Sequence, residues 1–390
     1  MQSHPIHGMI LYILCALTIL LAIDYAFFIR DICETWNDHK EFSPSSDEID
    51  TPFISIVIAA RNEENRISQC LNSISANDYP KSEYEIILID DHSEDDTKSI
   101  AEGLNILNLQ VFSLKSLIDQ REHVPSYKKE ALKRGVEKAK GSLILFTDAD
   151  VLVPPLWIRT MSRYILEKEV DLVTGPIRYH SNPSILQQFQ ALDIAGTMAW
   201  TASGIWSQKT YLANGANMIV KKSAYLKYHN QAGANQASGD DVFLIQSIAA
   251  ESPNRVDFIK NKNAITTTFP ENTWRELLIQ RLRWASKTSS YKNKRLQLKI
   301  GKIFAFNFSL FTLLIVGFLY ASWLTLAALG CFVFKMCLDF YLINHNKSMF
   351  TIRQKKRYLP FFVLIHSLFI ISIGSAAILN FKGSWKGRNV

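Results

Sequence analysis

The sequence predicts an α/β domain held at a membrane by apolar helices near both ends of the chain. Three observations lead there. Apolar stretches long enough to cross a bilayer stand near both termini, strand-like and helix-like segments alternate between them, and the strand-like segments are too apolar to have a wet face. We expect an N-terminal transmembrane anchor over 1–30, the α/β domain over 51–300, and a C-terminal transmembrane region over 301–390.

The composition agrees, since 48% of the 390 residues are hydrophobic, which is high for a protein without membrane segments. Residues 8–29 carry only one charge, Asp24. No Lys or Arg precedes this stretch and no small-residue cleavage site follows a short apolar core, so we expect a retained anchor rather than a cleaved signal.

The C-terminal region predicts two to three transmembrane helices. Residues 303–344 are about twice as long as one helix needs for a ~30 Å hydrocarbon core, which predicts two helices with a turn near Tyr320 to Trp323. A further apolar stretch covers 358–380. An odd number of helices would put the tail opposite the domain, whereas the basic loop 346–357 favours the cytoplasm. Either one stretch is interfacial or re-entrant, or the tail lies outside.

The net charge of +7 is concentrated in residues 285–302, which hold six Lys and Arg residues. Beside a membrane helix such a segment favours the cytoplasmic face, although an ordinary solvated charge run would look the same. No aromatic interleaving or binding motif accompanies the charge, so we expect no nucleic-acid partner. The five cysteines have no paired spacing, which argues against a disulfide framework or a zinc site.

The elements of the central domain follow in order. "FISIVIAA" (53–60) predicts a buried strand, followed by polar "RNEEN" and a helix, and "YEIILIDD" (84–91) predicts a second strand. "ALKRGVEKAKGS" predicts a basic amphipathic helix stopped by Gly141, and "LILFTDAD" is the next strand. Strands that alternate with helices and have no polar face indicate a parallel sheet covered on both sides.

Acidic residues gather at the strand ends, where ligands bind in such sheets. Three successive ends carry Arg61 to Glu63, Asp90 with Asp91, and Asp148 with Asp150. Carboxylates at one rim repel each other, and a hard divalent cation (Mg or Mn) is their natural partner. No glycine-rich dinucleotide or P-loop motif is present, so a nucleoside diphosphate held through the metal suits the rim. Alone, each pair could also be a turn or helix cap, or an adventitious calcium site.

Five motifs occur in order: "ISIVIAARNEE", "IILIDDHSEDDT", "KKEALKRGVEKAKGSLILFTDAD", "SGDDVFL" and "QRLRW". Their order and spacing over roughly 51–300 resemble a membrane-anchored family 2 glycosyltransferase of the Q-x-x-R-W type. The resemblance implies a GT-A (Rossmann-like) fold that transfers a sugar with inversion from a nucleotide-sugar, usually a UDP-sugar.

The same resemblance implies roles for individual residues. The donor-binding set would be Ala59, Arg61, Glu63, Asp91, Lys128, Asp148 and Asp150. Within it, Asp148 and Asp150 match the D-x-D motif, which implies contact with the ribose and the metal. Asp241 would be the catalytic base and Asp240 its neighbour, where the family commonly has Glu-Asp. Adjacent carboxylates raise each other's proton affinity, although as helix caps the two would be unremarkable.

In "QRLRW" (280–284), Gln280, Arg283 and Trp284 fall on one face of a helix. The resemblance implies that Arg283 neutralises the departing diphosphate and that Gln280 and Trp284 bind the acceptor. A juxtamembrane Trp/Arg belt is the alternative. "NGANMIV" (214–220) resembles a segment lining the acceptor pocket, and "WKGR" (385–388) also occurs in relatives that glycosylate lipids.

The expected function is therefore an inverting, metal-dependent transfer of a sugar to a lipid or saccharide hydroxyl. We expect an integral membrane protein, in a bacterial inner membrane, with its catalytic domain in the cytoplasm. A processive polysaccharide synthase is the alternative, although such enzymes normally carry more membrane helices. A non-catalytic membrane protein that binds a cation or nucleotide is more distant, because the base, D-x-D and Q-x-x-R-W motifs are all intact.

Overall fold

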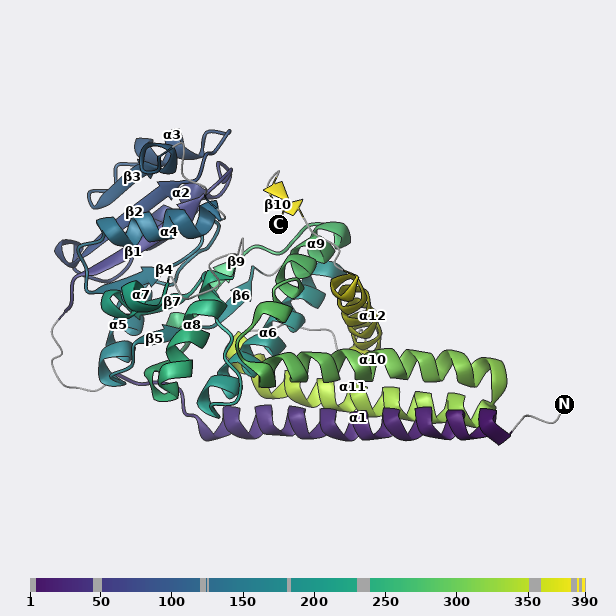
Figure 1. Cartoon of the computed structure of the whole chain (residues 1–390). Helices are drawn as coiled ribbons and strands as arrows, with labels where there is room; N and C mark the ends of the chain where they lie inside the picture. The colour runs from purple at the N-terminus through teal and green to yellow at the C-terminus, as the bar shows by residue number, and fades with distance from the viewer. Residues whose placement is uncertain are drawn as a thin grey trace.

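The computed structural model describes residues 5–44, 51–119, 124, 126–180, 184–229, 239–350, 359–379, 384–385 and 388–389. Figure 1 shows an α/β domain from which three long helices extend side by side, with the N-terminus at their far end. We call these helices the bundle; they are α1 (Pro5–Asp38), α10 (Lys294–Tyr320) and α11 (Ser322–Phe350).

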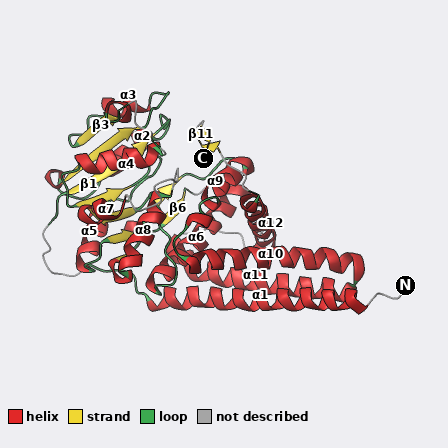
Figure 2. Cartoon of the chain, viewed as in Figure 1, coloured by secondary structure: helices red, strands yellow, loops and turns green. Residues whose placement is uncertain are grey.

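The domain is built on a seven-stranded sheet of order β3-β2-β1-β4-β7-β5-β8 (Figure 2). Its strands are β1 (Ile54–Ala60), β2 (Tyr84–Asp90), β3 (Leu109–Ser113), β4 (Leu143–Phe146), β5 (Leu172–Thr174), β7 (Met218–Lys221) and β8 (Val256–Phe258). A second, two-stranded sheet pairs β6 (Ile177–Tyr179) with β9 (Thr266–Thr268).

The expectation of a wholly parallel sheet is wrong at one strand. β7 runs antiparallel to both of its neighbours, β4 and β5, while the other pairs in the large sheet are parallel. A central strand is buried on both faces whichever way it runs. Its apolar pattern therefore predicts burial and carries no information about direction.

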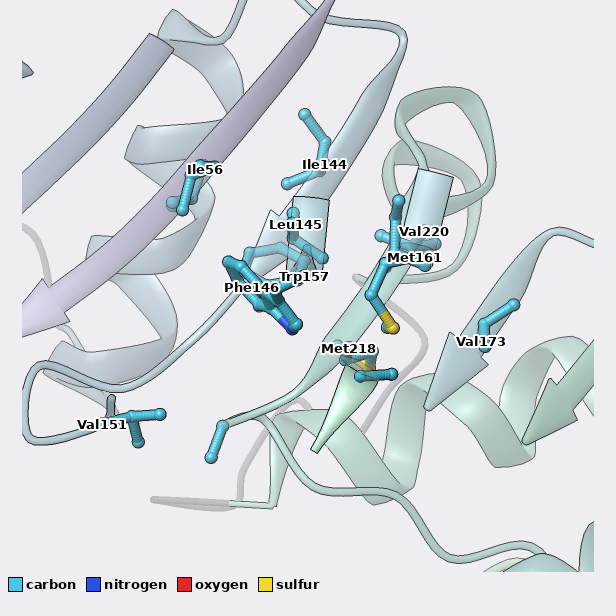
Figure 3. Close-up of a cluster of buried hydrophobic side chains, with 14 of the residues drawn as sticks. Ile56, Ile144, Leu145, Phe146, Val151, Trp157, Met161, Val173, Met218 and Val220 are labelled. Carbon is cyan, nitrogen blue, oxygen red and sulfur yellow. The ribbon is translucent and has the colours of Figure 1, made fainter. Parts of the chain in front are cut away.

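The helices of the domain pack on both faces of the sheet, so that β2 and β4 are buried along their whole length. They are α2 (Ile67–Ser75), α3 (Thr97–Gly103), α4 (Tyr127–Lys138), α5 (Trp157–Glu167), α6 (Ile185–Trp206), α7 (Lys222–Tyr228), α8 (Asp240–Glu251) and α9 (Trp274–Ala285). Figure 3 shows part of this core, which includes Phe146 of β4 and Trp157 of α5.

One glycine sets how closely α4 approaches the sheet. A Cβ atom at Gly135 would stand 2.4 Å from Cγ1 of Val57, so only glycine permits α4 to lie this near β1. At the other end of the helix, Oγ of Ser126 accepts a hydrogen bond from the backbone N–H of Lys129 and caps the first turn. This contact and this cap fix where α4 begins, which is beside the end of β4.

Four helices in the described part of the chain are long and apolar enough to cross a membrane: Gly8–Asp38, Lys294–Tyr320, Ser322–Phe350 and Pro360–Ile378. The predicted turn near Tyr320 is confirmed, because α10 ends at Tyr320 and α11 begins at Ser322. The C-terminal region thus has three such helices, the upper end of the predicted range.

The last of them, α12 (Leu359–Ile378), does not extend alongside the bundle. It lies obliquely against α10 and α11 and packs on α6 and α9, with Phe362 and Phe369 in one buried cluster with Phe189 and Leu277 (Figure 1). The chain then reaches β10 (Ser384–Trp385), which contacts α9 at the domain end of the bundle. The two middle residues of "WKGR" lie outside the described residues.

The core of the domain continues into the bundle at both junctions. Trp36 of α1 and Phe350 of α11 belong to the main buried cluster, and their rings lie 6.2 Å apart. Trp36 also packs on Trp206 of α6 at 5.9 Å, and its backbone oxygen accepts a hydrogen bond from Lys260. The first residues of the expected basic loop 346–357 thus belong to the end of α11, where Asn346, Met349 and Phe350 are buried and Lys347 is exposed, and residues 351–357 lie outside the described part.

At least four of the six cations in residues 285–302 contact the protein, and one of them is Lys292, whose Nζ lies 3.3 Å from Oγ of Ser247. Nζ of Lys299 and Lys302 lie 3.2 and 2.7 Å from the carboxylate oxygens of Asp24 on α1, and Lys287 is buried. The alternative of an ordinary solvated charge run therefore does not hold for these residues. The sequence shows how many charges the segment carries but not which way they point. Because the first turns of α10 pack against α1, lysines of these turns lie against the protein.

Candidate active site

The loops after β1 and β2 are tied together by Arg61. Its buried guanidinium donates from Nη1 to the backbone oxygens of Asp91 and His92, at 3.1 and 2.9 Å. The residues Asn62 and His92 have φ of 51° and 54°, a conformation that non-glycine residues rarely adopt. Such backbone persists where the surroundings enforce it, here through Arg61 and through Asn62 Oδ1, which accepts from the N–H of Glu94 at 2.9 Å.

The remaining residues expected around the nucleotide line the same edge. Ala59, the next-to-last residue of β1, is partly buried, and the N–H of Glu63 donates to Oγ1 of Thr97 at 2.7 Å. The buried carboxylate of Asp91 lies 3.0 Å from Nδ1 of His92. Its neighbour Asp90 has a buried Oδ1 with no hydrogen-bond partner among the described residues, which leaves an acceptor atom for a donor group of a ligand.

The D-x-D motif follows β4, where α4 begins. Nζ of Lys128 lies 2.7 Å from Oδ1 of Asp148, and both side chains are about one third exposed. Burial opposes the charge on Lys128, but the Asp148 carboxylate outweighs it and raises the pKa of the ammonium group. The structure therefore brings the two predicted residues Lys128 and Asp148 together.

A divalent cation fits this edge only if a ligand supplies most of its oxygens. The described residues contain no group of three or more His, Cys, Asp or Glu side chains that could hold a metal ion. Asp148 and Asp150 stand together at the end of β4 and offer hard carboxylate oxygens. This donor set suits a Mg or Mn ion that is bound through one or two carboxylates and completed by phosphate oxygens.

The predicted base lies at the start of α8, across the sheet edge. Oδ2 of Asp241 accepts from the N–H of Gly215 at 2.8 Å, and Oδ1 accepts from the N–H of Val242 at 2.8 Å. Gly215 precedes β7. Because β7 runs antiparallel to β4, its start, and with it Gly215, lies at the edge where β4 ends. Burial, and then the charge of Asp241, raise the pKa of Asp240 to about 6. The expected effect of the adjacent carboxylates is thus seen at Asp240, with burial as its larger cause.

The helix α9 carries the Q-x-x-R-W motif and begins at a capping box between Thr273 and Glu276. Nε2 of Gln280 donates to Oε1 of Glu271 at 2.7 Å, and the guanidinium of Arg281 stacks on the ring of Trp284, 4.0 Å from its centroid. These contacts fix the two residues expected to bind an acceptor.

Arg283 lies among carboxylates of both halves of the edge. Burial lowers the pKa of its guanidinium, while the charges of Asp148, Glu271 and Asp241 act in the opposite direction. Lys128 is likewise influenced by Asp148, Arg283 and Asp241. The site therefore joins Lys128, Asp148, Arg283 and Asp241, while Arg61 lies in the paired loops and Gln280 and Trp284 line α9.

Sequence reasoning missed three residues of this site. Lys287 is only 9% exposed, and burial lowers the pKa of its amine to about 8, with Asp241 the largest opposing influence. In the sequence it is one of the six cations of residues 285–302, and its only distinguishing signal is its place three residues after Trp284. Glu271 and Arg281 were missed because a single exposed-looking acid or base gives no sign of its partner.

Comparisons with known proteins agree with this geometry. Residues 51–287 match the Glycosyltransferase like family 2. Glycosyltransferase AglE of Haloferax volcanii is 31% identical over 128 residues, which are 33% of this chain and 40% of that protein. The beta-monoglucosyldiacylglycerol synthase of Synechocystis sp. is 24% identical over 195 residues, 50% of this chain and 35% of that one. The chain thus spans less than half the length of these relatives.

Among solved structures, the mannosyltransferase PcManGT from Pyrobaculum calidifontis, in complex with GDP-Man and Mn2+, aligns over 94% of this chain and 99% of that chain. The TM-score is 0.59 and the identity 15%, so the likeness shows the fold alone, which is of the GT-A type. The family match begins before β1, includes the whole large sheet, and ends at Lys287 beyond the Q-x-x-R-W motif. The chain therefore belongs to glycosyltransferase family 2.

Proposed function

We propose that the protein transfers a sugar, with inversion, from a UDP-sugar to a hydroxyl of a lipid-linked acceptor at a membrane surface. The observation that carries the proposal is the meeting of Asp241, Arg283 and the Lys128–Asp148 pair at one sheet edge. A base, two cations and a D-x-D carboxylate are what an inverting transfer from a nucleoside diphosphate requires.

In the reaction, the acceptor oxygen attacks the anomeric carbon and its proton passes to Asp241. The bond from that carbon to the diphosphate breaks, and the electron pair leaves on the phosphate oxygen. Hydrogen bonds from Gly215 and Val242 orient the carboxylate of Asp241. Arg283 and Lys128 stabilise the negative charge that grows on the diphosphate. A divalent cation held by Asp148 and Asp150 would supply further positive charge to the phosphate oxygens when bound.

Residues of the β1 and β2 loops suit the nucleoside. The buried Oδ1 of Asp90 can accept from a ribose hydroxyl or a base N–H, since it has no partner among the described residues. Arg61 holds the two loops in place, and the proposed donor residues Ala59, Glu63 and Asp91 belong to these loops or to the strand end beside them. We infer a uridine nucleotide from the family resemblance of these motifs.

The part of the protein proposed to contact the membrane is the bundle. Large apolar side chains such as Leu20, Phe318 and Phe334 are exposed on its outer surface, as in helices that face lipid. Asp24 with Lys299 and Lys302 marks the end of this surface nearest the domain. The hydrocarbon boundary then lies close to α9, and an acceptor lipid reaches the site by lateral diffusion. A cytoplasmic domain in a bacterial inner membrane completes the proposal.

The test is a screen of nucleotide sugars against lipid acceptors in membranes, with Asp241→Asn as the diagnostic variant. We expect UDP-sugar affinity to stay within a few fold while turnover falls by about 10² to 10⁴, the usual worth of a positioned base. Asp96→Asn, at an exposed aspartate beside α3, is the matched control and should change neither. Lost affinity with preserved turnover would make Asp241 a donor ligand instead.

A further inference from the structure

A chain of polar side chains leads from α12 to the ring of Trp284. Nε2 of His366 on α12 lies 3.6 Å from Oδ1 of Asp193 on α6. The other oxygen of Asp193 lies 2.5 Å from Nη2 of Arg281 on α9, and the face of the Arg281 guanidinium covers Trp284 at 4.0 Å. Three helices are thus linked through one carboxylate to one aromatic ring.

The Asp193–Arg281 part of this linkage is largely enclosed, whereas His366 is 31% exposed. Arg281 is 7% exposed and lies beside the cluster that contains Phe189, Leu277 and Phe369. Burial alone would raise the pKa of Asp193, but Arg281 and His366 hold it below its usual range. Because a buried ion pair often contributes no more stability than apolar side chains of the same size, stability alone does not explain its presence.

Arginine suits this place for a geometric reason. Its planar guanidinium can donate along one edge to a carboxylate and present its flat face to an indole ring, which the ammonium group of lysine cannot do. Arg281 and Trp284 are three residues apart on α9, so they are neighbours on one side of the helix. Arg281, held by Asp193, therefore packs against the ring of Trp284 and limits the space in which that ring can turn.

We propose that Arg281 is a positioning residue for the acceptor site: it is held by Asp193 and α12, and it fixes the ring on which the acceptor rests. The inference rests on the proposed function, in which Trp284 contacts the acceptor. It assigns to α12 a role beyond anchoring, since displacement of His366 would be transmitted through Asp193 to Trp284.

The first test measures Trp284 directly in the full-length protein, in detergent or nanodiscs. Subtracting the fluorescence of the matching Trp284→Phe variant isolates the emission of this ring. Arg281→Met should red-shift that emission and raise its acrylamide quenching constant, because the ring loses its cover. Arg275→Met, at an exposed arginine of the same helix, is the matched control and should leave both unchanged.

The second test uses the acceptor identified by the screen above. Arg281→Met should raise the acceptor KM by about tenfold, the upper range of a cation–π contact, while the affinity for the UDP-sugar stays unchanged. Arg281→Lys keeps the ion pair but not the flat face, so it should restore thermal stability without restoring the acceptor KM.

A double variant separates positioning from folding. Asp193→Asn leaves Arg281 buried without its anionic partner, so this variant could fail for stability reasons alone. Asp193→Leu combined with Arg281→Met replaces the pair by apolar groups and should recover the thermal midpoint. We expect the acceptor KM and the quenching of Trp284 to remain at the values of Arg281→Met.

Wild-type quenching and acceptor KM in both Arg281→Met and the double variant would overturn the inference. An equal loss of donor affinity would also overturn it, because that would indicate a general distortion of the site. If the screen finds no sugar transfer by the wild-type protein, the proposed function fails, and the quenching measurement still decides whether Arg281 positions Trp284.

Discussion

The two sides of the site are built differently. The donor side, which is the edge formed by β1, β2, β4 and α4, takes its residues from 59–150 and ties them mainly to the backbone, as Arg61 does to Asp91 and His92. On the acceptor side, formed by α8 and α9, backbone N–H groups hold Asp241 of α8, whereas the residues of α9 rely on contacts between side chains, such as Gln280 with Glu271 and Arg281 with Asp193.

This difference teaches which side is the more adaptable. Backbone groups remain when a neighbouring side chain changes, whereas an ion pair is lost with either partner. The donor side can therefore stay constant while the acceptor side varies. The acceptor side also depends on α12, an apolar helix outside the family match at 51–287. The following predictions test whether the two sides separate in function as they do in construction.

The largest loss of activity is expected at Asp150, one of the two D-x-D carboxylates on the donor side. Asp150→Ala should abolish turnover and metal-dependent nucleotide binding while the protein still folds, because Asp150 follows β4 rather than lying in the core. Isothermal titration with UDP, with and without Mn, measures binding, and circular dichroism checks the fold. Full activity of the wild-type protein in excess chelator would contradict the prediction.

The next effect concerns the junction of the domain with the bundle. Trp36 is 4% exposed and packs on Trp206 and Phe350, so Trp36→Ala should destabilise the protein by about 3–5 kcal/mol. Thermal unfolding in detergent measures this. Leu20→Ala, at an exposed site of the same helix, should shift the midpoint little. Equal shifts would mean that the domain does not depend on α1 for its core.

A pH dependence should appear at Lys287, between the two sides. Because burial lowers the pKa of its amine to about 8, the positive charge is lost as the pH rises through 8, and transfer should fall by about tenfold in that range. Lys287→Arg, which stays charged, should hold activity to higher pH.

Stability should change in the opposite direction over part of this range. The pKa of Lys287 is lower in the folded than in the unfolded chain, so the unfolded chain binds more protons between pH 8 and the ordinary lysine value of about 10.5. The contribution of Lys287 to the free energy of unfolding therefore rises with pH there. Calorimetry of the wild-type protein and Lys287→Met across this pH range measures the contribution of Lys287 to stability. If activity and stability fell together as the pH rises, Lys287 would be ruled out as the cause of the fall in activity.

The smallest effect is expected at Glu94, on the outer rim of the donor side. Its side chain is 79% exposed and lies 3.2 Å from Arg61, and exposed pairs contribute about 0–1 kcal/mol. Glu94→Gln should therefore change UDP-sugar affinity by less than about fivefold. A larger loss, measured by titration, would show that backbone contacts alone do not hold Arg61.

The donor side was largely predictable from the sequence, and the reason is local. The apolar runs of β1, β2 and β4 each end in their polar residues, so one pattern indicated both the strand and the site. The turn after Tyr320 followed from the length of one apolar block, and the family resemblance placed Lys128 and Asp148 in one donor-binding set, whereas their ion pair is seen only in the structure.

The acceptor side was not predictable to the same depth. The direction of β7 leaves no trace in its burial, and the oblique course of α12 depends on packing against α6 and α9. The partners Asp193 and Arg281 are 88 residues apart, and no sequence pattern around either residue predicts that they pair. Lys287 looked like a surface charge because sequence density does not reveal which lysines are enclosed.

The ion pairs of Asp24 have a consequence for how the protein is made. Asp24 lies on the first helix, whereas its partner Lys299 follows 275 residues later. At about 5–20 residues per second, the ribosome needs on the order of tens of seconds to supply that lysine. A lone aspartate costs about 2.5–3.5 kcal/mol in insertion at the centre of a membrane helix and less near an end of the apolar stretch, where Asp24 lies, so we expect the nascent α1 to sit only slightly shallower during this interval. Its final depth, and with it the seating of Trp36 in the domain, would then be reached only after α10 has left the ribosome.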